Sequence, residues 1–313
     1  MQKLILIKYG ELTTKKANRL LFIKHLENDI KTKLKGYNIN IIKDNSRMFI
    51  EVDNNFEEII SILKKVFGIH EIVIAYKVKT DVDTIKESVL EVVSKIPFRT
   101  FKVETKRSYK EFPYTSMEFN NVIGSLILKS IDNISVDVHN PEYELKIEIR
   151  NDYTYIYDRE IKGSGGYPSK VAGKGLLMLS GGIDSPVSGY LAMKRGIELE
   201  CIYFESPPHT SLEAKNKVKS LVERLCDYQT TIKLHVVNFT KIQEEIYKNA
   251  ESSYIITIMR RMMYRICEKV LKNNNMYILI NGESVGQVAS QTITSMNVIN
   301  SVTNIPVLRP VCC

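Results

Sequence analysis

The segment Leu179-Ser-Gly-Gly-Ile-Asp-Ser-Pro186 decides the fold of the second half of this sequence. An apolar run at residues 175–179 precedes it, and a helical pattern at residues 186–195 follows it. A glycine-rich turn between a strand and a helix lets backbone N–H groups approach an anion, and the helix adds its positive end. Asp184 or Ser185 can cap this helix, with Pro186 in its first turn. The segment therefore predicts a phosphate or pyrophosphate site at the carboxyl end of a strand.

Other nucleotide-binding loops do not fit this sequence. No G-x-x-x-x-G-K-[ST] motif is present, and no G-x-G-x-x-G motif follows a predicted strand. These absences count against a P-loop and against a dinucleotide site. The alternative to an anion site is an ordinary strand-to-helix turn that binds nothing.

Beyond this loop, strands and helices alternate along the chain. This rhythm is typical of a parallel sheet with helices on both faces. In the last helix, Ile255, Met259, Met262, Ile266 and Val270 share one face. The expected strands are residues 175–179, 199–204, 233–238 and 276–280, and the expected helices are residues 186–195, 212–225 and 254–271.

The first half has a different, α+β pattern. We expect strands at residues 4–9, 38–42, 48–52 and 69–78 and helices at residues 20–34 and 56–66. This β-α-β-β-α-β order is typical of a ferredoxin-like unit. A second mixed set follows, with helices 84–95 and 116–130 and strands 100–105, 144–150 and 153–159. A stretch rich in Gly, Pro and Ser, residues 162–170, reads as a linker between the halves.

Composition narrows the class of protein. The 313 residues suggest about two domains, and 44% hydrophobic with 26% charged residues is ordinary for a globular chain. No apolar run approaches the roughly 20 residues that span a bilayer, and the N-terminus lacks the apolar core of a signal peptide. Five cysteines without paired spacing agree with a reducing compartment. We therefore expect a cytoplasmic protein.

Basic charge is concentrated in two places. The net charge is +8, and residues 1–50 hold 11 Lys and Arg against 4 Asp and Glu. Clustered basic charge with interleaved aromatic residues is typical of a nucleic-acid surface, and the alternative is a solvated basic face. The second cluster supplies the candidate RNA-binding residues Arg99, Lys102, Lys106, Arg107 and Lys110.

The motif Ser-Gly-Gly-x-Asp-Ser resembles the PP-loop of ATP pyrophosphatases. Six further stretches stand in order along the chain: IKYGELT (7–13), TFKVETKR (100–107), SPPHTS (206–211), MRRMM (259–263), GESVGQVASQ (282–291) and VTNIPVLRP (302–310). Together, from residue 4 to residue 310, they resemble the bacterial tRNA sulfurtransferases that make 4-thiouridine. A PP-loop amide-forming ligase also fits the loop, but it leaves the N-terminal motifs unexplained.

The resemblance implies a domain plan. It places an N-terminal ferredoxin-like domain at residues 1–58, a THUMP RNA-binding domain at residues 59–163, a linker at residues 164–174 and an α/β, Rossmann-like PP-loop domain at residues 175–313. In that family the first two domains hold tRNA and the PP-loop domain carries out the chemistry. Both basic clusters fall in the parts that the resemblance assigns to RNA.

The resemblance also implies a reaction. ATP and Mg2+ would serve to adenylate uridine at position eight of tRNA, and pyrophosphate would leave. A cysteine desulfurase would supply persulfide sulfur, with a thiamine-pathway sulfur-carrier protein and a second copy of the chain as further partners. A second role in making the thiamine thiazole goes with the family. The implied ATP contacts are Met178, Leu179, Ser180, Gly181, Gly182, Asp184, Ser185, Tyr203, Phe204, Arg260, Gly282 and Gln291.

Sulfur chemistry requires a thiol. Cys201, Cys226 and Cys267 fall in predicted core elements and read as inert, and no C-x-x-C pair indicates zinc or an iron–sulfur cluster. Family members continue beyond Arg309-Pro310, and their reactive cysteine lies in that continuation. We therefore expect Cys312 or Cys313 to carry the sulfur. Together with Asp184 of the glycine-rich loop, they are the expected catalytic residues. The alternative is a C-terminally short protein that binds tRNA and ATP without completing sulfur transfer.

Overall fold

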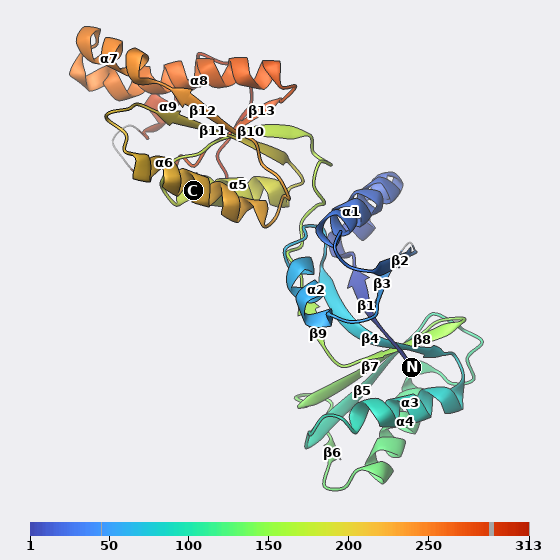
Figure 1. Ribbon diagram of the computed structural model, residues 1–313. Helices are drawn as coiled ribbons and strands as arrows, with labels where there is room; N and C mark the ends of the chain where they lie inside the picture. Colours follow the sequence, from blue (N-terminus) through green and yellow to red (C-terminus); the bar gives the residue numbers. More distant parts are fainter. Residues whose placement is uncertain (45, 288–290, 313) are drawn as a thin grey trace. The chain divides into compact units, whose positions relative to one another are not determined.

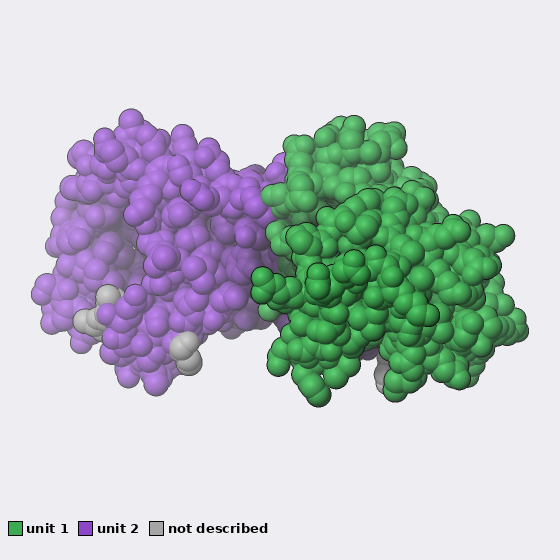
Figure 2. All heavy atoms as spheres, turned by 90° about the horizontal axis from the view of Figure 1, so that it is seen from below, with its two compact units in different colours: residues 1–10, 36–64, 69–163 green, residues 11–35, 65–68, 164–313 purple. Residues whose placement is uncertain are grey.

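The computed structural model describes residues 1–44, 46–287 and 291–312, and the chain divides into two compact units (Figure 2). The first unit holds residues 1–10, 36–64 and 69–163, and the second holds residues 11–35, 65–68 and 164–313. Two short segments of the N-terminal half therefore group with the C-terminal half. Within the described ranges, no helix is both long and apolar enough to cross a membrane.

A mixed sheet with the strand order β2-β3-β1-β4-β8-β7-β5-β6 forms the first unit, and β9 pairs with β4. Neighbouring strands run antiparallel except where β5 pairs with β6 and β7. The strands are β1 (Gln2–Lys8), β2 (Ile39–Lys43), β3 (Arg47–Val52), β4 (Glu71–Lys79), β5 (Thr100–Arg107), β6 (Ser135–Val136), β7 (Tyr143–Ile149), β8 (Tyr153–Tyr157) and β9 (Glu160–Lys162), and the helices are α2 (Phe56–Leu63), α3 (Val82–Val93) and α4 (Ser116–Ser130).

The two faces of this sheet differ in chemistry because side chains alternate along each strand. Phe101 and Ile147 point into an apolar core that α3 and α4 complete. Their neighbours Lys102 and Lys146 belong to the opposite face, where ion pairs link β5 to β7 and β7 to β9. Charged side chains on that face thus lie over strands from both parts of the first unit.

A parallel five-stranded sheet with the order β12-β11-β10-β13-β14 forms the second unit. Helices α5 and α6 pack on one face, and α8 and α9 pack on the other (Figure 1). From β10 the chain adds β11 and β12 on one side of the strand, and then adds β13 and β14 on the other side. The topological switch point therefore lies between β10 and β13. The strands are β10 (Lys174–Met178), β11 (Glu198–Glu205), β12 (Leu234–Asn238), β13 (Ile278–Ile280) and β14 (Val307–Leu308), and the helices are α1 (Arg19–Lys33), α5 (Asp184–Lys194), α6 (Leu212–Cys226), α7 (Thr240–Asn249), α8 (Ile255–Asn273) and α9 (Ile293–Asn300).

The segments from the N-terminal half are fastened to this second unit by named contacts. Phe67 is only 2% exposed and its ring lies 5.2 Å from that of Tyr228 and 5.3 Å from that of Tyr190. Lys65 forms an ion pair of 2.8 Å with Asp227, the residue that ends α6. Phe67 is therefore a core residue of the second unit.

The predicted fold class is confirmed: an α+β half with ferredoxin-like strand order precedes a parallel α/β sheet. Sequence reasoning missed β6, β9 and β14, which have two or three residues each, and the helices α7 and α9. Such short strands carry no readable periodicity.

The buried face of α8 differs from the apolar face predicted for the helix at residues 254–271. In α8 the fully buried side chains are Tyr264, Cys267 and Leu271, whereas Met259 and Ile266 are half-buried. The reason is that α8 packs against α7 and α9 as well as the sheet, so its buried row is set by three neighbours.

Candidate functional site

Two serines fold the glycine-rich loop after β10. Ser180 N donates to Ser185 Oγ over 3.0 Å, and Gly182 N donates to Ser180 Oγ over 3.3 Å. Helix α5 begins at Asp184, and its N-cap is Ile183, which makes no side-chain capping bond. The expectation that Asp184 or Ser185 caps the helix is therefore wrong. The Ser185 hydroxyl instead holds the loop that precedes the helix, which leaves the orphan N–H groups of α5 without a side-chain cap.

A close backbone approach brings the end of β13 to this loop. Gly282 lies two residues after β13, and a Cβ atom there would stand 2.6 Å from Ser185 N and 2.7 Å from the carbonyl carbon of Asp184. Only glycine fits such a distance. The carboxyl ends of β10 and β13 therefore meet at the switch point, which is where open parallel sheets bind ligands.

A cavity of about 270 Å³ opens at this junction. Eight of the twelve expected ATP contacts line it, namely Met178, Ser180, Gly182, Asp184, Ser185, Arg260, Gly282 and Gln291. Met263, Tyr264, Asn281 and Glu283 also line it, and sequence reasoning had not selected them.

Four expected contacts are not among the residues that line the cavity. Leu179 and Tyr203 are buried in the apolar cluster under α5 and α6. Phe204 points to the other face of the sheet, where its ring meets that of Phe239 edge-on at 5.6 Å. Gly181 belongs to the same loop, with its Cα facing the stem of Lys217.

A buried carboxylate organises the floor of the cavity. Glu283 Oε1 accepts from Arg260 Nη1 over 2.7 Å. Its second oxygen accepts from Arg309 Nε over 2.7 Å, from Asn281 Nδ2 over 2.8 Å and from Tyr264 OH over 3.2 Å. Burial, followed by the nearby Glu283 charge, raises the pKa of Tyr264, so its hydroxyl stays protonated and donates. Glu283 is thus fully engaged with the protein's own donors.

The sequence carried one usable signal for this carboxylate. Glu283 directly follows Gly282, just beyond the carboxyl end of β13, and acidic residues at such strand ends are candidates for a site. Tyr264 and Asn281 gave no such signal, because only the tertiary fold brings a helix and a strand end together here.

Gln291 presents an unsatisfied acceptor at the cavity. The side chain is 7% exposed, and its Oε1 atom has no hydrogen-bond partner within the described residues. A buried polar atom without a partner is costly, so such an atom at a cavity wall is a candidate contact for a ligand or an ordered water. The amino group of adenine and the hydroxyls of ribose are donors of the required kind, and ATP therefore fits this wall.

Magnesium would find few protein ligands here. Asp184 lines the cavity and its Oδ2 accepts from Gln287 Nε2 over 3.1 Å. In the described part of the chain, no group of three His, Cys, Asp or Glu side chains could hold a metal ion. A magnesium ion at this site would depend on phosphate oxygens and water for most of its ligands, as is usual for nucleotide-bound Mg2+.

The thiols differ in burial. Cys201 and Cys267 are buried, and burial raises the pKa of each thiol to about 12. Burial also raises the pKa of Cys226. Cys312 is half-buried, and its carbonyl accepts from Val285 N over 3.1 Å. Cys313 lies outside the described residues.

The candidate RNA-binding residues lie along β5 and on the segments next to its two ends. Lys102 pairs with Glu144 at 3.6 Å, and Lys106 pairs with Glu104 at 3.3 Å. The Arg107 guanidinium donates to the carbonyls of Lys110 and Phe112, at 3.1 and 3.2 Å. Arg99 donates its backbone N–H to Glu142 over 2.8 Å. Lys106 has a side chain well exposed to solvent, and Arg107 has a clear structural task in shaping the loop.

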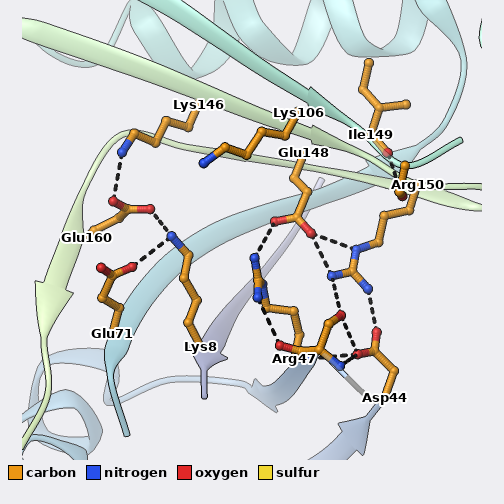
Figure 3. Close-up of polar contacts among 12 residues, drawn as sticks. Lys8, Asp44, Arg47, Glu71, Lys106, Lys146, Glu148, Ile149, Arg150 and Glu160 are labelled. Atoms are coloured by element: carbon orange, nitrogen blue, oxygen red, sulfur yellow. Dashed lines mark hydrogen bonds and ion pairs between the residues drawn. The ribbon is translucent and has the colours of Figure 1, made fainter. Parts of the chain in front are cut away.

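The charged sheet face beside them is internally neutralised (Figure 3). Lys8 lies between Glu71 and Glu160, and Lys146 also reaches Glu160, at 2.8 Å. A second cluster on the same face joins Arg47 and Arg150 with Glu148 and Asp44. Cations and carboxylates alternate there, so these pairs offer little free positive charge. The exposed Lys106, near the end of β5, is a better candidate for phosphate contact.

These features define a class of protein: an α/β nucleotide-binding domain with a PP-loop at its switch point, preceded by an α+β half. Three family models match the chain. The ferredoxin-like domain model of ThiI covers residues 4–73, the THUMP domain model covers residues 79–158, and the model described as thiamine biosynthesis protein (ThiI) covers residues 170–313.

Whole-chain relatives agree with these matches. A probable tRNA sulfurtransferase of Geobacillus kaustophilus is 48% identical over 98% of this chain and 77% of its own length. A probable tRNA sulfurtransferase of Halothermothrix orenii is 50% identical over 99% of this chain and 81% of its own length. A crystal structure of a 4-thiouridine synthetase in complex with RNA and ATP superposes with a TM-score of 0.91, at 36% identity, over all of this chain and 81% of that one. The chain belongs to the tRNA sulfurtransferase family.

Proposed function

We propose that this chain is an ATP-dependent sulfurtransferase that converts uridine at position eight of tRNA into 4-thiouridine. The observation that carries the proposal is the cavity at the switch point, where the Ser180–Ser185 loop, Arg260 and the unsatisfied Gln291 converge. The related 4-thiouridine synthetase structure, which contains RNA and ATP, supports the choice of both substrates.

The first step is activation of the base. The uridine O4 attacks the α-phosphorus of ATP, the bond from that phosphorus to the bridging oxygen breaks, and pyrophosphate leaves. The N–H groups of the loop and of the first turn of α5 stabilise the negative charge on the leaving group, and the Arg260 guanidinium contributes a fixed cation. Mg2+ would supply further charge neutralisation on the phosphates.

The second step is transfer of sulfur. The outer sulfur of a cysteine persulfide attacks C4 of the adenylated base, a C–S bond forms and AMP leaves. The sulfur–sulfur bond to the carrier cysteine is then cleaved by a thiol reductant. We propose Cys312 or Cys313 as the carrier within this chain, because burial disfavours the thiolates of Cys201 and Cys267.

Further parts of the proposal concern partners. A cysteine desulfurase supplies the persulfide, a second copy of the chain forms a homodimer, and the protein acts in the cytoplasm. A sulfur-carrier protein of thiazole synthesis is a second acceptor. The family model described as a thiamine biosynthesis protein supports this last role.

The decisive experiment follows both products. The 313-residue chain is incubated with ATP, Mg2+, a desulfurase, cysteine and unmodified tRNA, and pyrophosphate release and 4-thiouridine are measured together. A transcript with cytidine at position eight is the control. We expect both products with the uridine substrate and neither with the control.

Two outcomes separate the alternatives. Pyrophosphate release without 4-thiouridine would mean that activation is intact and that the chain does not complete sulfur transfer. Binding of tRNA and ATP without pyrophosphate release would favour a binding protein and would overturn the proposed catalysis.

A further inference from the structure

Arg309 is linked to the nucleotide cavity without lining it. It lies just after β14, and its guanidinium donates from Nε to Glu283 Oε2 over 2.7 Å and from Nη2 to Asn300 Oδ1 over 2.7 Å. Nη2 also donates to the hydroxyl of Tyr264 over 3.2 Å. This guanidinium is therefore held by Tyr264 of α8, by Asn300 of α9 and by Glu283 in the segment after β13.

Glu283 divides its two oxygens between two arginines. Oε2 is occupied by Arg309, Asn281 and Tyr264, so that Oε1 is left for Arg260 alone. The Glu283 side chain is 8% exposed, which makes both charge-assisted bonds strong. Whatever fixes Oε2 thereby fixes the direction in which Oε1 meets the Arg260 guanidinium.

The charges of this group do not cancel. Two arginines share one carboxylate, so the triad keeps one net positive charge. Within the described residues, Glu283 is the one carboxylate that forms an ion pair with Arg260 or Arg309. Arg260 uses Nη1 for that bond, and a guanidinium has further donors on its other nitrogens. The triad therefore holds a cation at the cavity wall with donor capacity to spare.

We propose that Glu283 and Arg309 are positioning residues for Arg260: Arg309 locks one oxygen of Glu283, and the other oxygen aims the Arg260 guanidinium at the phosphates of the nucleotide. The proposal rests on the proposed function, because it concerns ATP at the same cavity. It gives a role to Arg309, which lies outside the cavity on the segment after β14. Arg309 contributes a positive charge, and it also fixes the orientation of the Arg260 guanidinium through Glu283.

Charge and orientation can be separated because three variants change them differently. Glu283→Gln raises the net charge of the triad by one but leaves one acceptor oxygen for two arginines. We expect its ATP affinity to equal or exceed that of the wild type, while its rate of tRNA-dependent pyrophosphate release falls by about tenfold or more.

Arg309→Gln changes the charge in the opposite direction. The triad becomes neutral, and Glu283 is free to pair fully with Arg260. We expect ATP binding to weaken by about tenfold and the rate to fall. Arg309→Lys keeps the charge but loses the fork that spans Glu283 and Asn300, so ATP binding should stay within about threefold while the rate still falls.

The neighbouring Arg261 provides a matched control. It lies on the same helix, donates to the carbonyl of Val298 and to Ser301 Oγ at 3.0 Å, and does not line the cavity. Arg261→Gln removes more exposed hydrogen bonds, so it should lower the thermal stability of the chain less than Arg309→Gln does, with little effect on ATP affinity or rate. ATP affinity is measured by calorimetry, rate by pyrophosphate release, and folding by circular dichroism.

The pattern across variants decides the proposal. Opposite effects of Glu283→Gln and Arg309→Gln on ATP affinity, with a reduced rate in both, would support it. Equal losses of affinity in both, in proportion to a loss of thermal stability, would mean a purely structural role and would overturn it. If the wild type itself neither binds ATP nor releases pyrophosphate, the proposed function fails instead, and the two failures are thus distinguishable.

Discussion

Gln287 donates a hydrogen bond from Nε2 to Oδ2 of Asp184 over 3.1 Å. The two residues are far apart in the sequence, and they join the loop after β13 to the first residue of α5. Val285 N, on the same loop, donates to the carbonyl of Cys312. The orientation of the Asp184 carboxylate is therefore set by a segment that also contacts the last part of the described chain.

Asp184 should be required for activation but not for RNA binding. Asp184→Asn keeps the shape of the side chain and one acceptor oxygen, which can still accept from Gln287 Nε2, but it removes the negative charge. We expect tRNA-dependent pyrophosphate release to fall by about a hundredfold or more, because the variant lacks the carboxylate that would hold Mg2+ at the phosphates. Affinity for tRNA should stay within about threefold, since the basic candidates lie in the other unit. Filter binding and a pyrophosphate assay measure the two quantities.

Gln287→Ala is the companion variant. It leaves the Asp184 charge in place and removes the donor that orients it, so its loss of rate should be smaller, about tenfold. Weakened tRNA binding together with normal pyrophosphate release in either variant would contradict this assignment.

Gly282 should tolerate no side chain. In Gly282→Ala the new methyl group would stand 2.6 Å from Ser185 N, and a contact that short with backbone forces the loop and the strand end apart. We expect ATP affinity to fall by more than about tenfold, with a lowered midpoint of thermal unfolding. The control is Gly36→Ala, where nothing lies within 4 Å of the added atom. Unchanged ATP binding in Gly282→Ala would mean that this junction does not form the nucleotide site.

The sequence was most informative where the signal is local. Two glycines between an apolar run and a helix identify the Ser180–Ser185 loop, and strict alternation of elements identifies the parallel sheet that carries it. Gly282 came from the resemblance, yet its physical reason, a backbone approach to Ser185, is visible only in the structure.

The polar floor of the site could not be predicted in the same way. Tyr264 lies in a Met-rich helical stretch and Arg309 near the end of the sequence, and no local pattern marks either residue as part of the nucleotide site. Both matter because the fold brings them to Glu283, at 3.2 and 2.7 Å. No periodicity encodes which polar side chains converge across a sheet, so such networks emerge only with tertiary structure.

The basic end of β5 should contribute to tRNA affinity. Replacing Lys102 and Lys106 with Ala breaks only partly exposed ion pairs with Glu144 and Glu104, and their loss should cost little stability. For every phosphate that the variant no longer neutralises, the slope of log K against log salt should flatten by about 0.7 to 0.9, and ATP affinity should not change. Arg107→Ala is made separately, because it also releases the loop carbonyls of Lys110 and Phe112. A salt slope equal to that of the wild type would identify these residues as a solvated face.

The ion pairs of the first unit should make its stability depend on pH. Burial acts to raise the pKa of Glu160, but hydrogen bonds and charge from Lys146 and Lys8 outweigh it, so the pKa lies below its ordinary value of 4.5. A lowered folded-state pKa stabilises the fold above 4.5, and that contribution disappears as the pH falls through the folded value.

Glu160→Gln tests this sign. The variant should melt at a lower temperature than the wild type at about pH 6, and the difference should close as the pH falls towards about 3, where Glu160 becomes protonated. Glu91→Gln, which breaks an exposed helical pair with Lys95, is the control and should show a small difference at every pH. A difference for Glu160→Gln that stays constant across this range of pH would contradict the linkage.

The cysteines should differ strongly in their rates of alkylation. At about pH 8 a thiol with a pKa of about 12 is ionised in about one molecule in ten thousand, so Cys201 and Cys267 should resist iodoacetamide in the folded chain. Cys312 is half-buried and should react first among the described thiols. Peptide mass spectrometry after a timed reaction measures the order, with the urea-unfolded chain as the reference in which all sites react.

The cysteines that react first should also be the ones that carry sulfur. If Cys312 or Cys313 carries the persulfide, then Ser at both positions abolishes 4-thiouridine formation and leaves pyrophosphate release unchanged, because Cys312 is not among the described residues that line the adenylation site. Cys226→Ser is the control: its thiol is partly exposed, but burial raises its pKa, so thiolation should persist. If the wild type forms 4-thiouridine and the Cys312→Ser/Cys313→Ser variant does so equally well, the carrier is one of the remaining three cysteines. If neither forms 4-thiouridine while both release pyrophosphate, the sulfur-bearing thiol is not within these 313 residues, and activation and sulfur transfer are separable activities.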